Sequence, residues 1–409
     1  MNAATRNSLP VVIVGGGPAG MMCGLLLARA AVPVIVLEKH ADFLRDFRGD
    51  TVHPSTLELF HQLGMLEQLL ALPHSRIDEI GLRVAGREFR IADFRYLPVE
   101  APYVAMMPQW DLLDFIADKG ATYPGFALRM STEATGVVTD HDGRVSGVRL
   151  GGGGVLEAAL VIAADGRRSV LRDAAELPLE VLGAPMDVFW FRLDKPPGMV
   201  SESFGAVEAG HFIVFIDRRD YLQCAYVFRK GESEKVRARG LKEFRKSVSG
   251  FVPELATSLE SIRDWDQVKL LSVSLDRLTR WHRPGLLAIG DAAHAMSPIG
   301  GVGINVAVQD AVAAANVLAG PLATGRDPDP LLAQVQQRRW RAVTRMQALQ
   351  KFAQDRVIEP VLTRTEPIER PFLPARLLDR CALMRRIPGR IIGLGFDPVK
   401  IESPDTGRE

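Results

Sequence analysis

The chain has 409 residues, is 47% hydrophobic and carries a formal net charge of +1. A chain of this length can bury a substantial core and is expected to form two or three structural units. The near-zero net charge argues against nucleic acid as the main partner. Cys23, Cys224 and Cys381 are too scattered for a metal motif or a disulfide framework. The polar N-terminus lacks the apolar region of a signal peptide, so we expect a cytoplasmic protein.

The first segment predicts a nucleotide-binding unit. Residues 11–14 are a β-branched run, typical of a buried parallel strand, and residues 21–31 continue as an apolar helix. Three glycines between them have G-x-G-x-x-G spacing: Gly15, Gly17 and Gly20. Such glycines allow a tight turn, close approach to a pyrophosphate and close packing of helix on strand. A second strand ends at Glu38, 23 positions after Gly15, where a ribose hydroxyl favours a carboxylate.

Residues 11–37 are nearly uncharged, but glycines and prolines interrupt them. We expect no uninterrupted apolar helix of about 20 residues anywhere in the chain, and therefore no stable membrane insertion.

The next part of the chain mixes helices and strands. The pattern predicts one helix over Thr56–Leu70, strands of a hairpin-like insertion over 76–100 and a short helix over Gln109–Lys119. Residues 133–150 and 155–164 are expected to be strands, with the segment from Leu160 as the second half of a hairpin.

The strand that ends near Ala164 leads into the polar turn Asp165-Gly166, which opens a helix. Turns at the carboxyl ends of strands are where α/β folds place ligands. Asp165 could instead serve only as the N-cap of that helix.

From about 186 to 265 the strands become aromatic-rich and predict an antiparallel sheet that forms a pocket wall, with one charged helix over Glu232–Val248. The candidate substrate-binding residues are aromatic: Phe189, Phe191, Phe212 and Tyr226. Strict alternation puts Phe189 and Phe191 on the face opposite Trp190, and the sequence leaves open which face lines the pocket. Arg192, Arg218 and Arg219 could bind a carboxylate, although neighbouring aspartates favour surface ion pairs.

The last motif lies about 275 residues after the first. A buried strand at 286–289 precedes Gly290-Asp291-Ala292-Ala293-His294. Its remaining members are Pro298, Gly300, Gly301, Gly303 and Asn305. Helices are expected from there to the C-terminus.

These motifs resemble, in order, those of the single-component FAD-dependent aromatic hydroxylases, which are related to p-hydroxybenzoate hydroxylase. The resemblance covers roughly residues 10–345. Besides the glycine segments it rests on Arg48, ten residues after Glu38, and on Asp165-Gly166 with Ser169 and Arg172 in a D-G-x-x-S-x-x-R pattern.

The resemblance implies an FAD site assembled from all four motifs: Gly15, Gly17, Ala19, Gly20, Glu38, Lys39, Arg48, Gln109, Asp165, Gly166, Asp291, Gly301, Gly303, Ile304 and Asn305. Glu38 would bind the adenosine ribose, Arg48 and Gln109 the pyrophosphate and ribitol region, and Asp291 a ribitol hydroxyl. The backbone at 303–305 would donate to the N1/O2 edge, because a helix N-terminus stabilises the negative charge of a reduced flavin.

Catalytic residues are harder to assign. His53 is a candidate proton relay, because it follows Arg48 in a segment that lies near the flavin in relatives. Pro298, a member of the last motif, is the second catalytic candidate. His294 follows Asp291 closely and is interpreted as a structural hydrogen-bonding group.

The fold implied is α/β, with a Rossmann-like FAD-binding domain, an inserted antiparallel-sheet substrate domain and a helical C-terminal segment. The expected FAD-binding domain comprises 1–75, 101–185 and 266–320. The substrate domain comprises 76–100 and 186–265, and the helical segment 321–409.

The implied activity is hydroxylation of an aromatic or heteroaromatic small molecule through a flavin C4a-hydroperoxide, with NADH or NADPH as transient electron donor and O₂ as cosubstrate. The protein is expected to be a monomer or homodimer. Two alternatives share the FAD motifs: a reductase of the geranylgeranyl-reductase type, and an FAD-binding protein without turnover.

Overall fold

The computed structural model describes most of the chain: residues 8–44, 50–196, 203–208, 210–218, 220–366, 368 and 373–406. The predicted site residue Arg48 and the candidate Arg219 lie outside the described residues.

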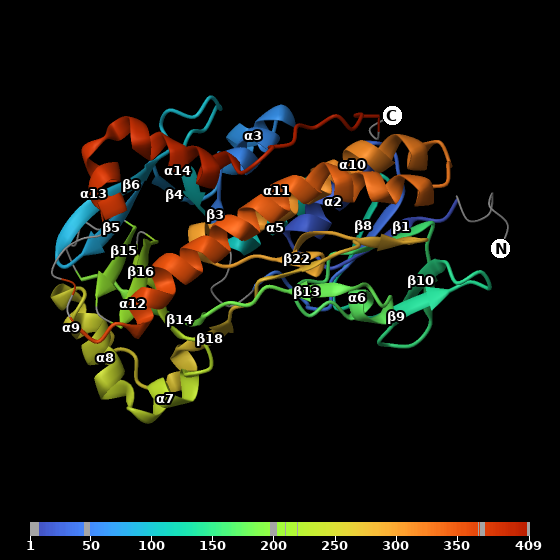
Figure 1. Cartoon of the computed structure of the whole chain (residues 1–409). Coiled ribbons are helices and arrows are strands. Elements are labelled where there is room, and N and C mark those ends of the chain that lie inside the picture. Colours follow the sequence, from blue (N-terminus) through green and yellow to red (C-terminus); the bar gives the residue numbers. More distant parts are fainter. Residues whose placement is uncertain are drawn as a thin grey trace.

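A six-stranded sheet forms the centre of one end of the molecule (Figure 1). Its order is β20 (His282–Arg283), β21 (Leu286–Ala288), β12 (Leu160–Ala163), β1 (Val11–Val14), β2 (Val34–Leu37) and β8 (Phe126–Arg129). All neighbours pair in parallel except β20 and β21. The prediction that Leu160 continues a hairpin was wrong, because β12 inserts between β1 and β21 and its four apolar residues are fully enclosed there.

Helices α2 (Pro18–Arg29) and α10 (Gly303–Ala323) pack against each other beside this sheet, together with α5 (Gln109–Ala121). The expectation that no long apolar helix exists was wrong. Residues 299–323 are long and apolar enough to cross a membrane, but 83% of the 18-residue apolar window within them is buried inside the protein. The apolar residues of α10 are therefore explained by packing, since α2 and α11 (Leu332–Ala353) cover it.

A seven-stranded sheet lies at the other end (Figure 1). Its order is β18 (Lys269–Ser272), β14 (Met186–Asp194), β17 (Tyr221–Arg229), β16 (His211–Asp217), β15 (Phe204–Glu208), β5 (Glu79–Val84) and β6 (Arg87–Asp93). Only β15 and β5 pair in parallel. The hairpin insertion predicted over 76–100 thus extends the aromatic-rich sheet.

Two predicted helices are each broken by a glycine. The segment 56–70 divides at Gly64 into α3 (Pro54–Gln62) and α4 (Leu66–Leu70), and the segment 232–248 divides at Gly240 into α7 (Ser233–Ala238) and α8 (Leu241–Ser249). Both glycines have positive φ, +68° and +87°, which ends a right-handed helix.

Smaller sheets and short helices complete the fold. Three three-stranded sheets comprise β9 (Ala134–Thr139), β10 (Val145–Leu150) and β11 (Val155–Glu157); β13 (Leu179–Val181), β19 (Asp276–Leu278) and β22 (His294–Ala295); and β3 (Thr51–Val52), β4 (Ser75–Ile77) and β7 (Val104–Met106). Short helices include α6 (Val170–Ala174) and α9 (Ala256–Leu259).

The C-terminal helices join the two ends of the molecule. The long helix α11 runs from beside α10 towards the seven-stranded sheet, where a π-helical turn (Gln354–Ile358) and α12 (Glu359–Thr363) follow (Figure 1). The helices α13 (Leu373–Arg380) and α14 (Ala382–Leu394) pack on β6. Parallel and antiparallel sheets with a helical C-terminal segment confirm the predicted fold class.

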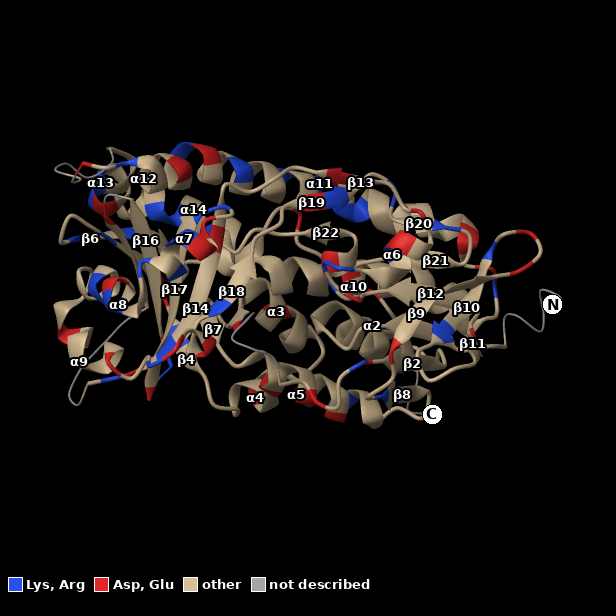
Figure 2. Cartoon of the chain, turned by 90° about the horizontal axis from the view of Figure 1, so that it is seen from below, with Lys and Arg blue, Asp and Glu red and all other residues tan. Residues whose placement is uncertain are grey.

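Charges of both signs are interspersed in the view from below, and this view shows no continuous basic stripe (Figure 2).

Candidate active site

Two glycines at the β1–α2 connection, Gly15 in the loop and Gly20 in the first turn of α2, are required by close backbone contacts. Gly15 has φ +111°, and a Cβ there would lie 2.2 Å from the carbonyl oxygen of Ala164. A Cβ on Gly20 would lie 2.0 Å from the oxygen of Gly15. A Cβ on Gly17, the N-cap of α2, would instead meet open space. The loop therefore leaves room in front of the helix N-terminus, which fits a pyrophosphate.

Glu38, at the end of β2, lies beside this loop. It is 7% exposed, and its carboxylate accepts hydrogen bonds from the backbone N–H groups of Gly16 and His40, both at 3.0 Å. The adjacent Lys39 is exposed. The acid predicted for the ribose is thus held next to the glycine loop.

The two glycine segments meet in space. Gly290 begins the 3₁₀ turn η3 (Gly290–Ala292) with φ +60°. A Cβ on Gly290 would lie 2.9 Å from that of Ala19 and 3.2 Å from that of Ala307. The tight contact joins the N-terminal turns of α2 and α10, so the ends of both helices lie at one site.

The Asp165-Gly166 turn borders the same loop, since Asp165 follows the residue that Gly15 approaches. Its carboxylate accepts the Ser169 hydroxyl at 2.5 Å and the Leu171 N–H at 3.1 Å. Ser169 is the N-cap of α6. Asp165 is therefore not the N-cap itself but stabilises the start of α6 through hydrogen bonds to Ser169 and Leu171. Burial raises the pKa of its carboxyl group.

Asp291 accepts a hydrogen bond from Arg167 Nε at 2.9 Å, and both side chains remain about 30% exposed. The Nη1 atom of Arg167 is buried without a hydrogen-bond partner among the described residues. Sequence reasoning missed Arg167, although it follows directly on the Asp165-Gly166 turn.

The loop before α10 is tied to the segment after residue 50. Gly301 has φ +64°, and its carbonyl oxygen accepts the Thr51 hydroxyl at 2.8 Å. Asn305 is 3% exposed, and its Oδ1 accepts the backbone N–H of His53 at 2.9 Å and the Thr56 hydroxyl at 2.7 Å. The start of α10, including Gly303 and Ile304, is held in place by these bonds.

His53 is almost fully buried, and its Nδ1 donates to the carbonyl oxygen of Ile392 in α14 at 2.8 Å. Burial lowers the pKa of His53 to about 4, so the imidazole is neutral at neutral pH. This geometry links α14 to the loop. The other catalytic candidate, Pro298, is partly buried and accepts the Gly301 N–H at 3.0 Å.

His294 forms a buried structural network. Its Nε2 is 2.5 Å from Asp310 Oδ2, and the same carboxyl group accepts Arg339 Nε at 2.8 Å and the Gly290 N–H at 3.1 Å. His294 and Arg339 hold the pKa of Asp310 below its usual range. These contacts position Gly290 and support the structural interpretation of His294.

The expectation that Arg218 forms a surface ion pair was wrong. It is buried and forms a short ion pair with Asp50, and its Nη2 also donates to Gln223 Oε1 at 2.9 Å. Asp50 accepts the N–H of Gln109, the first residue of α5, at 3.3 Å. The pair connects the β16–β17 turn to the residue directly before β3, and no local sequence pattern predicts it.

The structure decides which face of the seven-stranded sheet lies towards these loops. Phe189, Phe191 and Tyr226 are buried on the opposite face, against Phe244 of α8, so their assignment to the pocket was wrong. Alternation puts their neighbours on the other side. That face carries Trp190, Phe212 and Val214 and packs with Ile299 and Ile358. Of the four predicted residues, Phe212 alone lies there.

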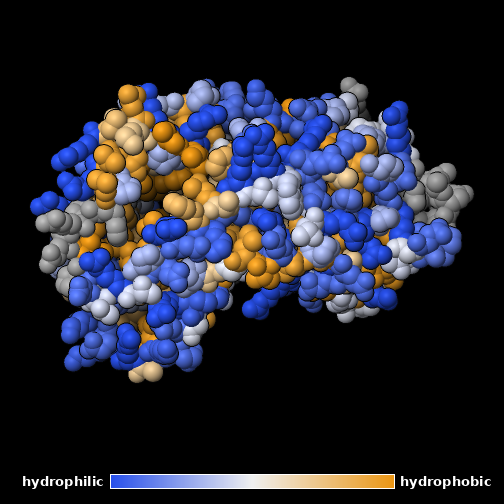
Figure 3. Space-filling model, in the orientation of Figure 1, coloured by the Kyte–Doolittle hydropathy of each residue, from blue (hydrophilic) through white to orange (hydrophobic). Residues whose placement is uncertain are grey.

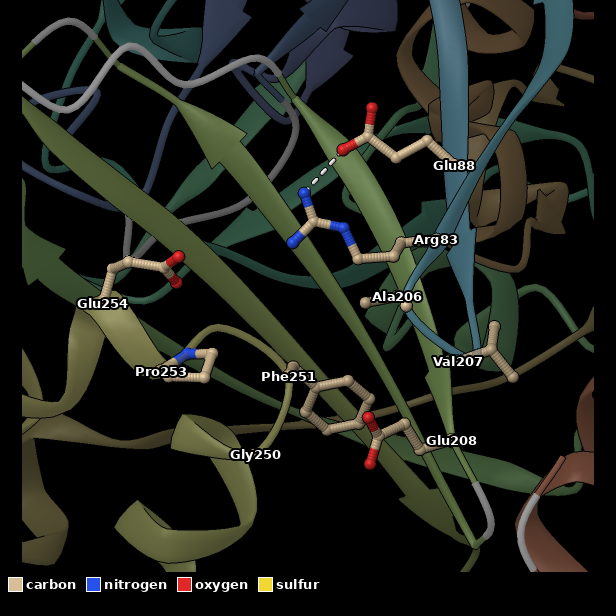
Figure 4. Close-up of a pocket in the computed structure, with 10 residues that line it drawn as sticks. Arg83, Glu88, Ala206, Val207, Glu208, Gly250, Phe251, Pro253 and Glu254 are labelled. Atoms are coloured by element: carbon tan, nitrogen blue, oxygen red, sulfur yellow. Dashed lines mark hydrogen bonds and ion pairs between the residues drawn. The ribbon is translucent and has the colours of Figure 1, made fainter. Parts of the chain in front are cut away.

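A cavity of about 370 Å³ lies elsewhere (Figure 4). It opens between the β5–β15 pair and the loop after α8, and its charged residues include Arg83, Glu88, Glu208 and Glu254. Arg83 already pairs with Glu88. None of the predicted site residues lines it.

Comparison with known proteins agrees with this geometry. Residues 8–349 match a family described as FAD binding domain. The chain is 33% identical over 313 residues to 6-methylpretetramide 4-monooxygenase of Streptomyces rimosus, covering 75% of this chain and 74% of that protein. It is 27% identical over 313 residues to dialkyldecalin synthase of Streptomyces rugosporus, covering 74% and 63%. The solved structure of Pseudomonas aeruginosa PqsL with 2-aminobenzoylacetate has a TM-score of 0.74 at 22% identity, covering 87% and 98%.

Proposed function

The chain belongs to the FAD binding domain family of FAD-dependent monooxygenases, and from that premise we propose that it hydroxylates a polycyclic aromatic small molecule, with NADH or NADPH as electron donor and O₂ as cosubstrate. The observation that carries the proposal is the contact between Gly290 and Ala19, which unites two helix N-termini next to an apolar sheet face.

FAD fits this arrangement, and each of the motifs that meet here would hold a different part of it. The open space at Gly17 would take the pyrophosphate and Glu38 the adenosine ribose. Asp291, oriented by Arg167, would take a ribitol hydroxyl. The N–H groups that start α10 would stabilise negative charge on the flavin ring. When bound and reduced, FAD supplies the reaction with O₂ that hydroxylation requires.

The protein itself positions the substrate and excludes water. The face of Trp190, Phe212 and Val214 offers apolar area to a flat ring system. Figure 3 shows that this side of the molecule is hollowed between α14 and the C-terminal part of α11, with hydrophobic residues at the rim. A polycyclic substrate is proposed because the relative of 33% identity is named 6-methylpretetramide 4-monooxygenase.

The test is NAD(P)H oxidation by FAD-loaded protein, with hydroxyanthraquinones, phenols, quinolones and hydroxypyridines offered one at a time under ¹⁸O₂. We expect one class to stimulate oxidation with little hydrogen peroxide and to yield a product containing one ¹⁸O atom. An Asp291→Ala control should bind FAD more weakly. Tight FAD binding without stimulated oxidation or labelled product for any compound would contradict the proposal and favour a reductase or a non-oxidative role.

A further inference from the structure

Gln354 is a buried amide without a hydrogen-bond partner. Its side chain has no exposed surface, and neither Nε2 nor Oε1 has a partner among the described residues. A buried amide that makes no hydrogen bond is costly, and native proteins rarely keep one without a use. The side chain is therefore a donor and an acceptor that a ligand could satisfy.

Its position in the helix places it at the edge of the site. Gln347 donates to the carbonyl oxygen of Ala295, and Gln350, on the same helix face, donates to those of Ser297 and Ile299. Gln354 is one turn further along, and Ile358, one turn beyond it, packs with Ile299. Gln354 thus lies past the end of the loop that precedes α10, towards the seven-stranded sheet.

The helix changes geometry at this residue. The π-helical turn begins at Gln354 and ends at Ile358. Such turns are rare and occur frequently at functional sites. The turn lies between α11 and α12, at the end of α11 that is directed towards the seven-stranded sheet (Figure 1).

A second unpaired donor comes from the sheet. Trp190 belongs to the cluster that contains Ile299 and Ile358, and its Nε1 is buried without a partner among the described residues. An indole N–H is a donor only, whereas the amide of Gln354 offers both a donor and an acceptor. Trp190 and Ile358, four residues after Gln354, pack around the same apolar cluster, so the two unpaired polar groups come from the sheet and from the helix that border this cluster.

We propose that Gln354 and Trp190 form a substrate subsite that binds adjacent carbonyl and hydroxyl oxygens on a fused aromatic ring. The N–H groups of both side chains would donate to the carbonyl oxygen, and Oε1 of Gln354 would accept from the hydroxyl group. The apolar surroundings would pack on the ring faces. The subsite rests on the proposed function for its substrate class, and binding tests it without turnover.

The experiment compares 1,8-dihydroxyanthraquinone with anthracene, which has the same three rings without oxygen. Dissociation constants are measured on FAD-loaded protein from the change in flavin absorption, and thermal unfolding is followed without ligand. Gln354→Leu removes the polar groups at similar volume. Gln337→Leu makes the same change at an exposed position of α11 and serves as the control.

We expect Gln354→Leu to weaken binding of the dihydroxy compound by at least about tenfold, since a hydrogen bond of about 1.4 kcal/mol corresponds to tenfold and Leu removes both bonds of the amide. Anthracene affinity should change less than about twofold, and the unfolding temperature should stay or rise because an unpaired amide is lost. Trp190→Phe should weaken the dihydroxy compound selectively as well.

Equal affinity of the unaltered protein for both probes, including no binding of either, would overturn the subsite. So would a lower unfolding temperature of Gln354→Leu with unchanged affinity, which would mark a structural residue. If hydroxylation fails but the selective loss of affinity is found, the proposed function is wrong and the subsite stands.

Discussion

At the scale of single residues, burial decides the chemistry of His53. It is the residue whose type and position most suggested a proton relay, yet its environment keeps the ring neutral and its Nδ1 committed to Ile392. A buried imidazole of this kind stabilises a fold by holding two segments together. A part for His53 in catalysis stays a prediction, because its hydrogen bond to α14 is explained by a structural role alone.

The pKa of His53 gives a pH-dependent stability. Its folded pKa of about 4 lies below the ordinary 6.5, so the unfolded chain takes up a proton that the folded chain does not. Stability from this group is present above pH 6.5 and is lost as the pH falls towards 4. Between pH 7.5 and 5 the loss is about 2 kcal/mol.

The measurement is chemical unfolding at both pH values. His53→Asn keeps a donor near Nδ1 but does not titrate, so its stability should depend less on pH by that amount. His61→Asn, at an exposed position, should match the unaltered protein. An unchanged pH dependence in His53→Asn would show that the histidine is not buried neutral.

At the scale of elements, glycines decide where helices end and how closely they pack. Periodicity predicted the existence of the helices over 56–70 and 232–248, but the breaks at Gly64 and Gly240 follow from backbone conformation, which periodicity does not report. Glycine also sets the position of α14. A Cβ on Gly389 would lie 2.1 Å from the carbonyl oxygen of Asp93 in β6.

Gly389→Ala should therefore push α14 off β6 and destabilise the protein by about 1–3 kcal/mol, the usual cost of overpacking. Gly320→Ala is the matched control, because a Cβ in that helical position of α10 meets nothing within 4 Å. It should stabilise the protein by about 0.5–1 kcal/mol. Thermal unfolding of the two variants checks this, and equal shifts of the same sign would contradict the contact.

At the scale of the whole molecule, polar contacts join the seven-stranded sheet to the small sheet of β3, β4 and β7. The Asp50–Arg218 pair is the central one, and Ser75 Oγ adds a hydrogen bond to the carbonyl oxygen of Asp217 at 3.1 Å. Burial raises the pKa of Asp50, and Arg218 opposes that shift. Removing either member of the Asp50–Arg218 pair would leave the other as a buried charge without its partner.

Breaking this pair from one side leaves a buried charge alone. Asp50→Asn and Arg218→Met should each cost about 3–5 kcal/mol, whereas the double variant should cost clearly less than their sum. Asp355→Asn breaks the exposed pair with Lys351 and should cost about 1 kcal/mol or less. Thermal unfolding and FAD affinity of all four variants provide the test, and additive costs would refute the coupling.

The sequence by itself determined the family and the fold class, because these depend on glycine spacings and strand ends that are local in the chain. The residues assigned to the nucleotide stay a prediction. Gly15, Gly20 and Gly290 are glycine for a steric reason that holds in any context of this fold. The domain boundaries and the roles of Arg48 and Pro298 stay predictions. Only the tertiary structure decided what depends on distant partners. It put Phe189 and Phe191 on the packing face, buried Arg218 against Asp50 and left Gln354 unpaired, since burial and pairing are set by residues far away in the sequence.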